Sequence, residues 1–139
     1  MTLHIYIDGA CKGNPGPGGI GIAVHDENRD LLKQYCQFIP HCTNNEAEYT
    51  ALLKALEAAH RLGAGRVCVY SDSLLLVRQF NGQYKVKKEN LRASLEKIRQ
   101  KASHFESVSL RHIPREQNEL ADSLANLAVK RSKKRSPSA

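Results

Sequence analysis

The chain has 139 residues, 41% of them hydrophobic and 25% charged, which is enough to bury a core as one domain of ordinary size. It contains no apolar run that approaches the length of roughly 18 residues needed to span a membrane. It also contains no leader in which charged residues precede an apolar stretch. These features argue against a membrane-spanning protein, and we expect a soluble, untargeted, cytoplasmic chain with no membrane partner. A monomer is the default expectation. The four cysteines form no CxxC pair and match no zinc spacing, so we expect reduced structural thiols.

The net charge of +7 is unevenly distributed. Residues 130–139 hold five bases and no acid, and residues 85–101 hold seven bases and two acids, so the rest of the chain is slightly acidic. Each basic stretch alone is typical of a solvated face. Together with an acidic body they suit a metal site beside a surface that binds a polyanion. We expect residues 1–130 to form the domain and residues 131–139 to be a basic, disordered tail.

Three strands are predicted in the first third of the chain. Apolar and polar residues alternate over Leu3–Ile7, which is the pattern of a strand that ends at Asp8. Five glycines and two prolines within Gly9–Gly19 then predict an irregular loop, because both residue types break regular elements. Further strands are predicted at Ile20–Val24 and Leu31–Ile39, with a polar hairpin turn between them.

Helices enter the pattern after the third strand. Thr43 and Glu46 form a capping box that opens a helix to about Leu62. Apolar periodicity then predicts, in order, a strand at Val67–Tyr70, a helix after Ser73 to about Phe80, a helix at Lys88–His104, a strand at Val108–Ile113 and a helix at Gln117–Arg131. This order predicts an α/β fold with a mixed sheet, which starts as an antiparallel meander, continues through helical crossovers and is covered on both faces.

Glu48 is an acid on the apolar face of the first predicted helix. On a helical wheel it lies in the centre of the stripe formed by residues such as Leu52 and Ala55. Glu46 and Glu57 fall on the opposite side, where a cap and a solvated face explain them. An ionised carboxylate that faces a core is costly unless something compensates it, so Glu48 is a candidate functional residue.

Three further acids could meet Glu48. Asp8 and Asp72 each follow a short apolar strand, and Asp122 lies near the start of the last helix, one turn after Asn118. Taken singly, an acid that ends a strand or starts a helix is common. Four acids converging without a basic partner would repel, and protonation or a divalent metal would relieve the repulsion. Ligation by oxygen alone points to Mg²⁺ or Mn²⁺ rather than zinc.

Four motifs stand around these acids in a fixed order. They are Ile7-Asp8-Gly9-Ala10 with the Gly-Asn-Pro-Gly-Pro-Gly-Gly segment, Thr43-Asn44-Asn45 with Glu48, Ser71-Asp72-Ser73, and His112 followed by Asn118 and Asp122. A single motif of this kind is unspecific, whereas four in order are specific. Through them the chain resembles type 1 ribonuclease H over roughly residues 3–130.

The resemblance implies a ribonuclease H-like fold, with a five-stranded mixed sheet flanked by helices. It implies hydrolysis of the RNA strand of RNA–DNA hybrids by an endonuclease that leaves 5′-phosphate and 3′-hydroxyl ends. Asp8, Glu48, Asp72 and Asp122 would bind two Mg²⁺ ions, or Mn²⁺ as a substitute, one activating the attacking water and the other stabilising the leaving 3′-oxygen. His112 matches a histidine in a mobile loop that assists proton transfer or product release, although a histidine at a strand end is more often structural.

The resemblance also implies contacts to the minor groove of the hybrid. The matching positions are Gly9, Ala10, Cys11, Asn14, Asn44 and Asn45. The Thr43 hydroxyl and nearby backbone N–H groups would hold a phosphate of the DNA strand. The same Thr43 oxygen is the expected N-cap of the helix, so the two roles compete for it.

Two features depart from well-known members of the family. The chain has no Trp and only Gly82 to Lys87 between its second and third helices, so it resembles the subgroup that lacks a basic protrusion. Lys85, Lys87 and Lys88, together with the basic tail, are candidates for replacing the phosphate interactions of that protrusion. His41 stands where we expect an arginine beside the phosphate pocket, so phosphate binding should strengthen as the pH falls.

Two other functions stay open at this stage. Another nuclease of the same superfold, such as a junction resolvase or an exonuclease, would not need the Thr-Asn-Asn and Gly-Asn-Pro-Gly motifs. A non-catalytic module that binds hybrids would be expected to have lost at least one acid, and all four are present. We expect an RNA–DNA hybrid as the partner, and the sequence leaves double-stranded RNA open as a second substrate.

Overall fold

The computed structural model describes the backbone of residues 1–135 and the side chains through Arg131. Within this part, five strands and four α-helices follow one another in the order that the sequence predicts. They are β1 (Thr2–Cys11), β2 (Gly16–His25), β3 (Leu31–Cys42), α1 (Asn44–Arg61), β4 (Arg66–Ser71), α2 (Leu74–Phe80), α3 (Glu89–Ala102), β5 (Ser107–His112) and α4 (Glu119–Arg135), with a short 3-10 helix η1 (Arg115–Gln117) before α4. No helix in residues 1–135 is long and apolar enough to cross a membrane.

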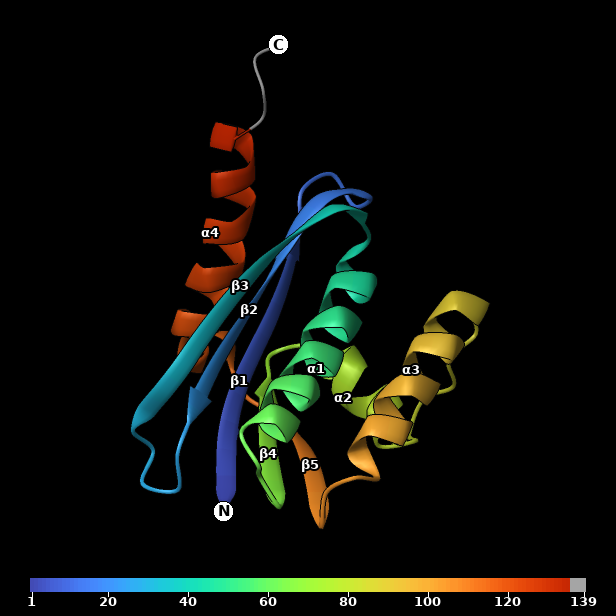
Figure 1. Ribbon diagram of the computed structural model, residues 1–139. Helices are drawn as coiled ribbons and strands as arrows, with labels where there is room; N and C mark the ends of the chain where they lie inside the picture. Colours follow the sequence, from blue (N-terminus) through green and yellow to red (C-terminus); the bar gives the residue numbers. More distant parts are fainter. Residues whose placement is uncertain (136–139) are drawn as a thin grey trace.

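The strands form one mixed sheet in the order β3-β2-β1-β4-β5 (Figure 1). β1, β2 and β3 pair antiparallel, which confirms the predicted meander, and β4 and β5 join in parallel. The pairing of β1 with β4 ends at Ile7 and Ser71, whereas its pairing with β2 continues to Cys11. The residues just beyond Ile7 and Ser71 therefore lie at the carboxyl edge of a parallel pair, where ligand sites of α/β proteins form.

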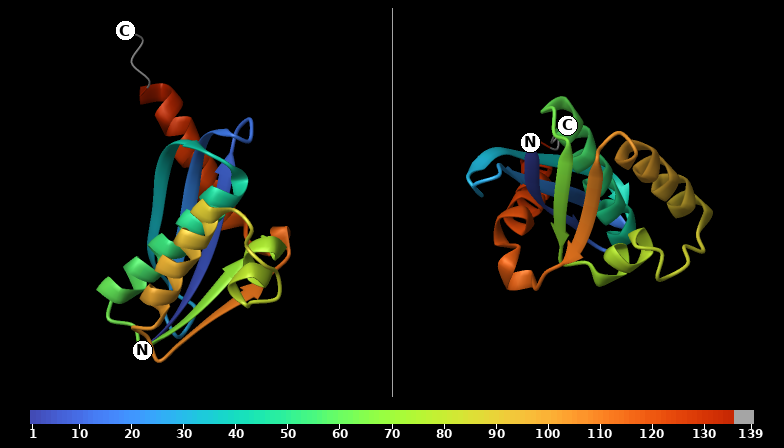
Figure 2. Two further views of the ribbon diagram at one scale, coloured as in Figure 1. Left: turned by 90° about the vertical axis from the view of Figure 1, so that its right-hand side faces the viewer. Right: turned by 90° about the horizontal axis from the view of Figure 1, so that it is seen from below.

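Helices cover both faces of the sheet, as predicted. α1 lies on one face with α2 and α3 beside it, and α4 lies on the other face (Figure 2). Leu3, Ile5 and Ile7 of β1 are fully buried in one cluster with Leu52 and Leu56 of α1. Burying a side chain of this size contributes roughly 1.5–3 kcal/mol, so this layer fixes the position of α1 on the sheet.

The glycine-rich segment is mostly strand, and the predicted long loop is wrong. β1 continues through Asp8 to Cys11 and β2 already begins at Gly16, so only Lys12–Pro15 lie outside the strands. Asp8 is therefore inside a strand rather than at its end. The acid still lies at an edge, because the parallel half of the sheet stops one residue before it.

Contact with α4 explains two of the glycines in β2, Gly19 and Gly21. A Cβ at Gly21 would lie 2.1 Å from the carbonyl oxygen of Ala121, and a Cβ at Gly19 would lie 2.4 Å from that of Ala125. Only glycine lets the backbone of a helix approach a strand this closely. The glycines therefore serve a long-range packing contact rather than a local turn.

The start of α1 confirms the predicted capping box. The Thr43 hydroxyl accepts from the Glu46 N–H at 3.1 Å, and the Glu46 carboxylate accepts from the Thr43 N–H at 2.8 Å. β3 runs three residues past its predicted end, through Pro40 to Cys42. It is an edge strand, where a residue without an N–H can be tolerated.

α4 differs from the prediction at both ends. It begins at Glu119, after η1, rather than at Gln117. Its backbone stays helical to Arg135, so the predicted tail at residues 131–139 is helical over its first five residues. The lysines and arginines of this stretch suit the negative end of a helix dipole. Residues 136–139 lie outside the described part of the chain.

Candidate active site

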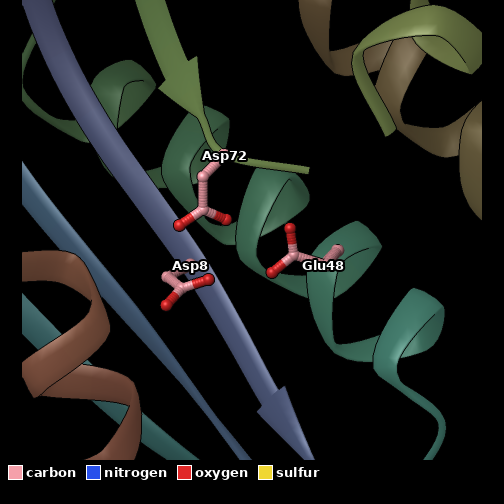
Figure 3. A group of neighbouring side chains, drawn as sticks. All are labelled: Asp8, Glu48 and Asp72. Atoms are coloured by element: carbon pink, nitrogen blue, oxygen red, sulfur yellow. The ribbon is translucent and has the colours of Figure 1, made fainter. Parts of the chain in front are cut away.

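Three carboxylates from distant parts of the chain meet at the carboxyl edge of β1 and β4. One oxygen from each of Asp8, Glu48 and Asp72 lies within 4.8 Å of the other two (Figure 3). Asp8 comes from β1, Glu48 from α1, and Asp72 directly follows β4. Asp8 and Glu48 are each only 6% exposed. The structure therefore brings together three of the four acids that the sequence singled out.

Gly9 allows α1 to lie directly on β1. A Cβ at this position would lie 2.6 Å from the Ala47 carbonyl carbon and 2.7 Å from the Glu48 nitrogen. The space beside Gly9 is thus occupied by α1. The Gly9 N–H donates to a Glu48 carboxylate oxygen and to Asp8 Oδ1, the latter at 3.0 Å. One glycine therefore fixes the separation of two acids.

The two glutamates at the start of α1 have different environments, as the helical wheel predicts. Glu48 points toward the sheet, where the Ser71 hydroxyl donates to its Oε2 at 3.5 Å. Glu46 caps the helix and also accepts from Asn90 Nδ2 at 3.0 Å. Glu46 is therefore a structural residue that ties α1 to α3.

Asp122 lies in the first turn of α4 and lines the same cavity, of about 450 Å³, as the other three acids. Its Oδ1 accepts from Asn126 Nδ2 at 3.3 Å. The guanidinium of Arg115 lies 4.0 Å from the same oxygen. Asp122 is less buried than Asp8 and Glu48, because its side chain is 32% exposed.

Asn118 connects the elements that carry the acids. Its side chain is 1% exposed, and its Nδ2 donates to the Ile7 carbonyl at 2.8 Å and to Asp72 Oδ2 at 3.4 Å. Its carbonyl accepts the N–H of Asp122 at 3.1 Å. One buried residue thus contacts β1, the segment after β4 and α4. The sequence marked Asn118 only by its spacing, and this role was not predicted.

Burial and mutual repulsion raise the proton affinity of the cluster. Desolvation, followed by the negative charges of Glu48 and Asp72 and an interaction with Asp122, raises the pKa of Asp8 to about 9. Desolvation also raises the pKa of Glu48 to about 7, against the lowering effect of the Gly9 N–H. Asp8 therefore retains its proton near neutral pH, and Glu48 is partly protonated, unless a cation compensates them. Their donors are all oxygen, which suits Mg²⁺ or Mn²⁺.

The residues expected to contact substrate divide into two groups. Five of them line the acidic cavity: Gly9, Ala10, Cys11, Asn44 and Asn45. Asn14 lies beside it, and its Oδ1 accepts the Asn44 N–H at 2.9 Å, which joins the short loop after β1 to the start of α1. The Thr43 hydroxyl is engaged as the N-cap.

The three lysines lie on the exposed segment between α2 and α3. Lys85 lines a second cavity, of about 660 Å³, between this segment and α3. Lys87 and Lys88 are exposed at the start of α3. None of the three lines the acidic cavity among the residues that the structure describes.

His112 is the last residue of β5, opposite Ser71, within the predicted strand Val108–Ile113 and not in the mobile loop that the resemblance implies. The sheet pairing thus extends over it, and the Ile113 N–H still donates to the Ser71 carbonyl at 2.9 Å. Its side chain is exposed and is not part of the cavity lining in the described residues. Arg115, which sequence reasoning missed, lines the cavity instead. The only signal for it was a base in the short polar segment before Asn118.

The chain matches known proteins over almost its whole length. Residues 6–128 match the family described as reverse transcriptase-like. The ribonuclease HI of Halobacterium salinarum is 37% identical over 127 residues, and the match covers 91% of this chain and 64% of that protein. A ribonuclease H of Legionella pneumophila is 35% identical over 143 residues, and the match covers 93% of this chain and 97% of that protein. The chain thus spans less than two thirds of the Halobacterium relative.

Solved structures agree with these sequence matches. The crystal structure of RNase H1 from Halobacterium salinarum gives a TM-score of 0.91 at 36% identity, covering 94% of this chain and 98% of its own. LC11-RNase H1, isolated from compost and solved in complex with an RNA/DNA hybrid, gives 0.88 at 40% identity, covering 94% and 98%. With this agreement in sequence and structure, the chain belongs to the type 1 ribonuclease H family.

Proposed function

We propose that this protein is a metal-dependent endoribonuclease that hydrolyses the RNA strand of RNA–DNA hybrids. The convergence of Asp8, Glu48 and Asp72 in one cavity supports this most strongly. A module that only binds nucleic acid gains nothing from buried acids, because they repel one another and the phosphates. The LC11 relative was solved with an RNA/DNA hybrid, which supports the same substrate here.

Asp8, Glu48, Asp72 and Asp122 are the residues proposed to hold two Mg²⁺ ions, with Mn²⁺ as a substitute. Their oxygen donors fit hard cations, and the raised pKa values of Asp8 and Glu48 mean that a cation would displace protons from the cluster. Such cations would supply Lewis-acid catalysis and activation of water at neutral pH. The expected products carry 5′-phosphate and 3′-hydroxyl ends.

The chain's own residues would orient the acids. The Gly9 N–H and the Ser71 hydroxyl hold Glu48 against the sheet. The buried amide of Asn118 holds Asp72 relative to β1. Because these donors are themselves fixed by strands and helix packing, the acids would keep their geometry before substrate arrives. Arg115 adds one positive charge at the cavity, where an incoming phosphate would pass.

Substrate recognition is proposed to use the side of the cavity formed by α1 and the end of β1. Asn44, Asn45 and the backbone at Gly9–Cys11 line it and offer donors and acceptors to 2′-hydroxyls and base edges in a minor groove. Asn14 would contact the hybrid from the adjoining loop. Thr43 with the helix N-terminus, and Lys85, Lys87 and Lys88 on the basic segment, would contact phosphates of the DNA strand.

The decisive experiment is a cleavage assay on one end-labelled hybrid with Mg²⁺, Mn²⁺ or EDTA. Matched double-stranded RNA and double-stranded DNA are run beside it, and the ends of the products are mapped. We expect internal cuts in the RNA strand of the hybrid that need a divalent metal. Chromatography with light scattering checks the expectation that the protein is a monomer.

The other outcomes identify the alternatives. Hybrid binding without cleavage under any metal would refute the proposal and favour a non-catalytic binding module. Cuts in double-stranded DNA, or cuts only at strand ends, would favour another nuclease of the same superfold. Cuts in double-stranded RNA beside those in the hybrid would add a second substrate without removing the first.

A further inference from the structure

Cys11 and Cys42 form a thiol pair at the edge of the acidic cavity. Cys11 ends β1 and lines the cavity, whereas Cys42 ends β3 and is only 2% exposed. Cys11 Sγ lies 2.9 Å from the Cys42 carbonyl oxygen and 3.8 Å from that of Gly16. The Cys11 side chain therefore already reaches the backbone of Cys42, which lies 31 residues further along the chain.

Gly18 leaves the space that this pair needs. A Cβ at Gly18 would lie 2.4 Å from Cys42 Sγ and 2.6 Å from the Ala10 carbonyl oxygen. Gly18 is the strand partner of Cys11, so its missing side chain allows the Cys42 sulfur to lie beside the end of β1. Burial, then the charge and hydrogen bond of Cys11, raise the pKa of Cys42 to about 11.

We propose that Cys11 and Cys42 are an oxidative modification site, where a disulfide oxidant such as oxidised glutathione closes an internal disulfide that weakens hybrid binding. The Cys11 thiolate attacks one sulfur of oxidised glutathione and releases one glutathione. The Cys42 thiolate then attacks the Cys11 sulfur of the mixed disulfide and releases the second. Two protein thiols are oxidised, one oxidised glutathione is reduced to two glutathione molecules, and these take up both protons.

The surrounding structure favours this pair over the other cysteines. A disulfide needs Cα atoms about 4.4–6.8 Å apart with Cβ atoms facing each other. Cys11 is followed by Lys12–Pro15, the segment outside the strands, so a local shift can supply the final approach. Cys36 and Cys68 lie in β3 and β4, with β2 and β1 between them. Cys36 and Cys68 therefore lack the geometry needed for a disulfide with each other, and both can be replaced without removing the proposed pair.

The effect on the site follows from the neighbours of the two cysteines and rests on the proposed function. Thr43, which caps α1, comes directly after Cys42, and the Asn44 N–H is already bound to Asn14 Oδ1 at 2.9 Å. A disulfide would draw the end of β1 toward the start of α1 and move Cys11 within the cavity. We expect hybrid binding to weaken about tenfold, equivalent to the loss of one or two hydrogen bonds.

The test uses the full chain with Cys36→Ser and Cys68→Ser, which leaves only the proposed pair. After treatment with oxidised glutathione, we expect both remaining thiols to disappear, the mass to fall by about 2 Da and a proteolytic peptide to join residues 11 and 42. Cys42→Ser in the same background should instead gain one glutathione at Cys11. Thermal melting of the Cys42→Ser variant checks that it folds. The loss of mass in the protein that keeps both Cys11 and Cys42 is measured independently of that variant.

Hybrid binding is then measured by anisotropy on the reduced, oxidised and re-reduced protein. Weaker binding by the protein whose mass shows the closed disulfide, restored by reduction, supports the proposal. Two persistent free thiols, a stable mixed disulfide, or a closed disulfide with unchanged hybrid binding would overturn it. Failure of the reduced protein to cleave hybrid would refute the proposed function separately, because the thiol and mass measurements need no activity.

Discussion

Asp8 shows how the site depends on a residue that the fold holds at a cost. It is buried, it lies within reach of Glu48 and Asp72, and its pKa of about 9 is well above the value near 3.9 expected in the unfolded chain. The native state therefore binds more protons than the unfolded state between these two values. By linkage, the stability that protonated Asp8 contributes is complete below the unfolded pKa and is lost as the pH rises through the folded pKa.

We expect the melting temperature of the metal-free protein to fall by several degrees between about pH 5 and pH 9. Asp8→Asn should flatten this dependence, and added Mg²⁺ should raise the melting temperature most at the alkaline end. Thermal melts in EDTA and in Mg²⁺ measure both effects. Glu116→Gln, which changes an exposed acid in η1, is the control and should leave the slope unchanged. An undiminished slope in Asp8→Asn would contradict the raised pKa.

Asp8→Asn and Asp72→Asn should each reduce cleavage by about 10³-fold or more while hybrid binding stays measurable, because each removes a proposed metal ligand and not a phosphate contact. Single-turnover cleavage and anisotropy separate the two quantities. Glu57→Gln, on the face of α1 where Glu57 pairs with Lys54, should behave as wild type. A tenth of wild-type activity in both aspartate variants would refute their assigned roles.

Arg115 and His112 offer a sharper comparison, since only Arg115 lines the acidic cavity in the described structure. We expect Arg115→Ala to lower kcat/KM about tenfold, because it removes a positive charge beside the phosphate. His112→Ala should lower kcat by less at saturating substrate if its exposed ring acts only in proton transfer or product release. Steady-state kinetics on one hybrid measure both variants. A larger loss for His112→Ala would mean that its side chain reaches the reacting phosphate after all.

Packing between elements explains what the sequence could and could not predict. α1 was predicted with its cap and its inward acid, because both depend on residues a few positions apart. Gly19 and Gly21 of β2 were misread because the reason for them is α4, about 100 residues later, and local propensity carries no trace of that partner. The cavity position of Arg115 depends on the path of the segment between β5 and α4, which periodicity does not describe.

Gly21→Ala tests the contact between β2 and α4. The added methyl group would meet two backbone atoms, the Ala121 oxygen at 2.1 Å and the Ala125 nitrogen at 2.7 Å, so α4 would have to move. We expect a loss of about 1–3 kcal/mol in unfolding free energy, measured by urea denaturation. Gly65→Ala is the matched control, because its nearest neighbour is a side-chain oxygen at 3.5 Å. Equal stability of the two variants would mean that α4 is not packed as described.

On the scale of the whole molecule, charge is segregated. Four acids, Asp8, Glu48, Asp72 and Asp122, share one cavity, while bases concentrate on the segment between α2 and α3, along α3 and at the end of α4. A polyanionic nucleic acid could therefore contact the bases while its phosphate backbone lies against the cavity, once that cavity holds cations. The arrangement suits a nuclease that lacks the basic protrusion of other family members.

Deleting residues 132–139 should weaken hybrid binding and reduce its salt dependence, because the deletion removes three basic residues. The deletion starts at residue 132 so that Arg131, which contacts Cys36, is kept. The slope of log K against log salt should fall by about 0.7–0.9 for each phosphate that the shortened chain no longer neutralises. Anisotropy titrations at several salt concentrations measure it. Cleavage at saturating substrate should persist. Lys54→Gln is the control for loss of charge alone, because Lys54 lies outside the basic stretches of the chain. An unchanged salt slope after the deletion would mean that the tail does not take part in binding.

The bond from Asn118 to the Ile7 carbonyl spans 111 positions of a 139-residue chain. Its formation requires that α4 has docked on a sheet whose central strand comes from the opposite end of the sequence. Closing a loop of this length carries a large entropic cost, so we expect this contact to form late in folding. Metal affinity should therefore return during refolding only once α4 has docked. We therefore expect cleavage of hybrids only from the completely folded protein. A nascent chain on the ribosome that still lacks α4 should not cleave them.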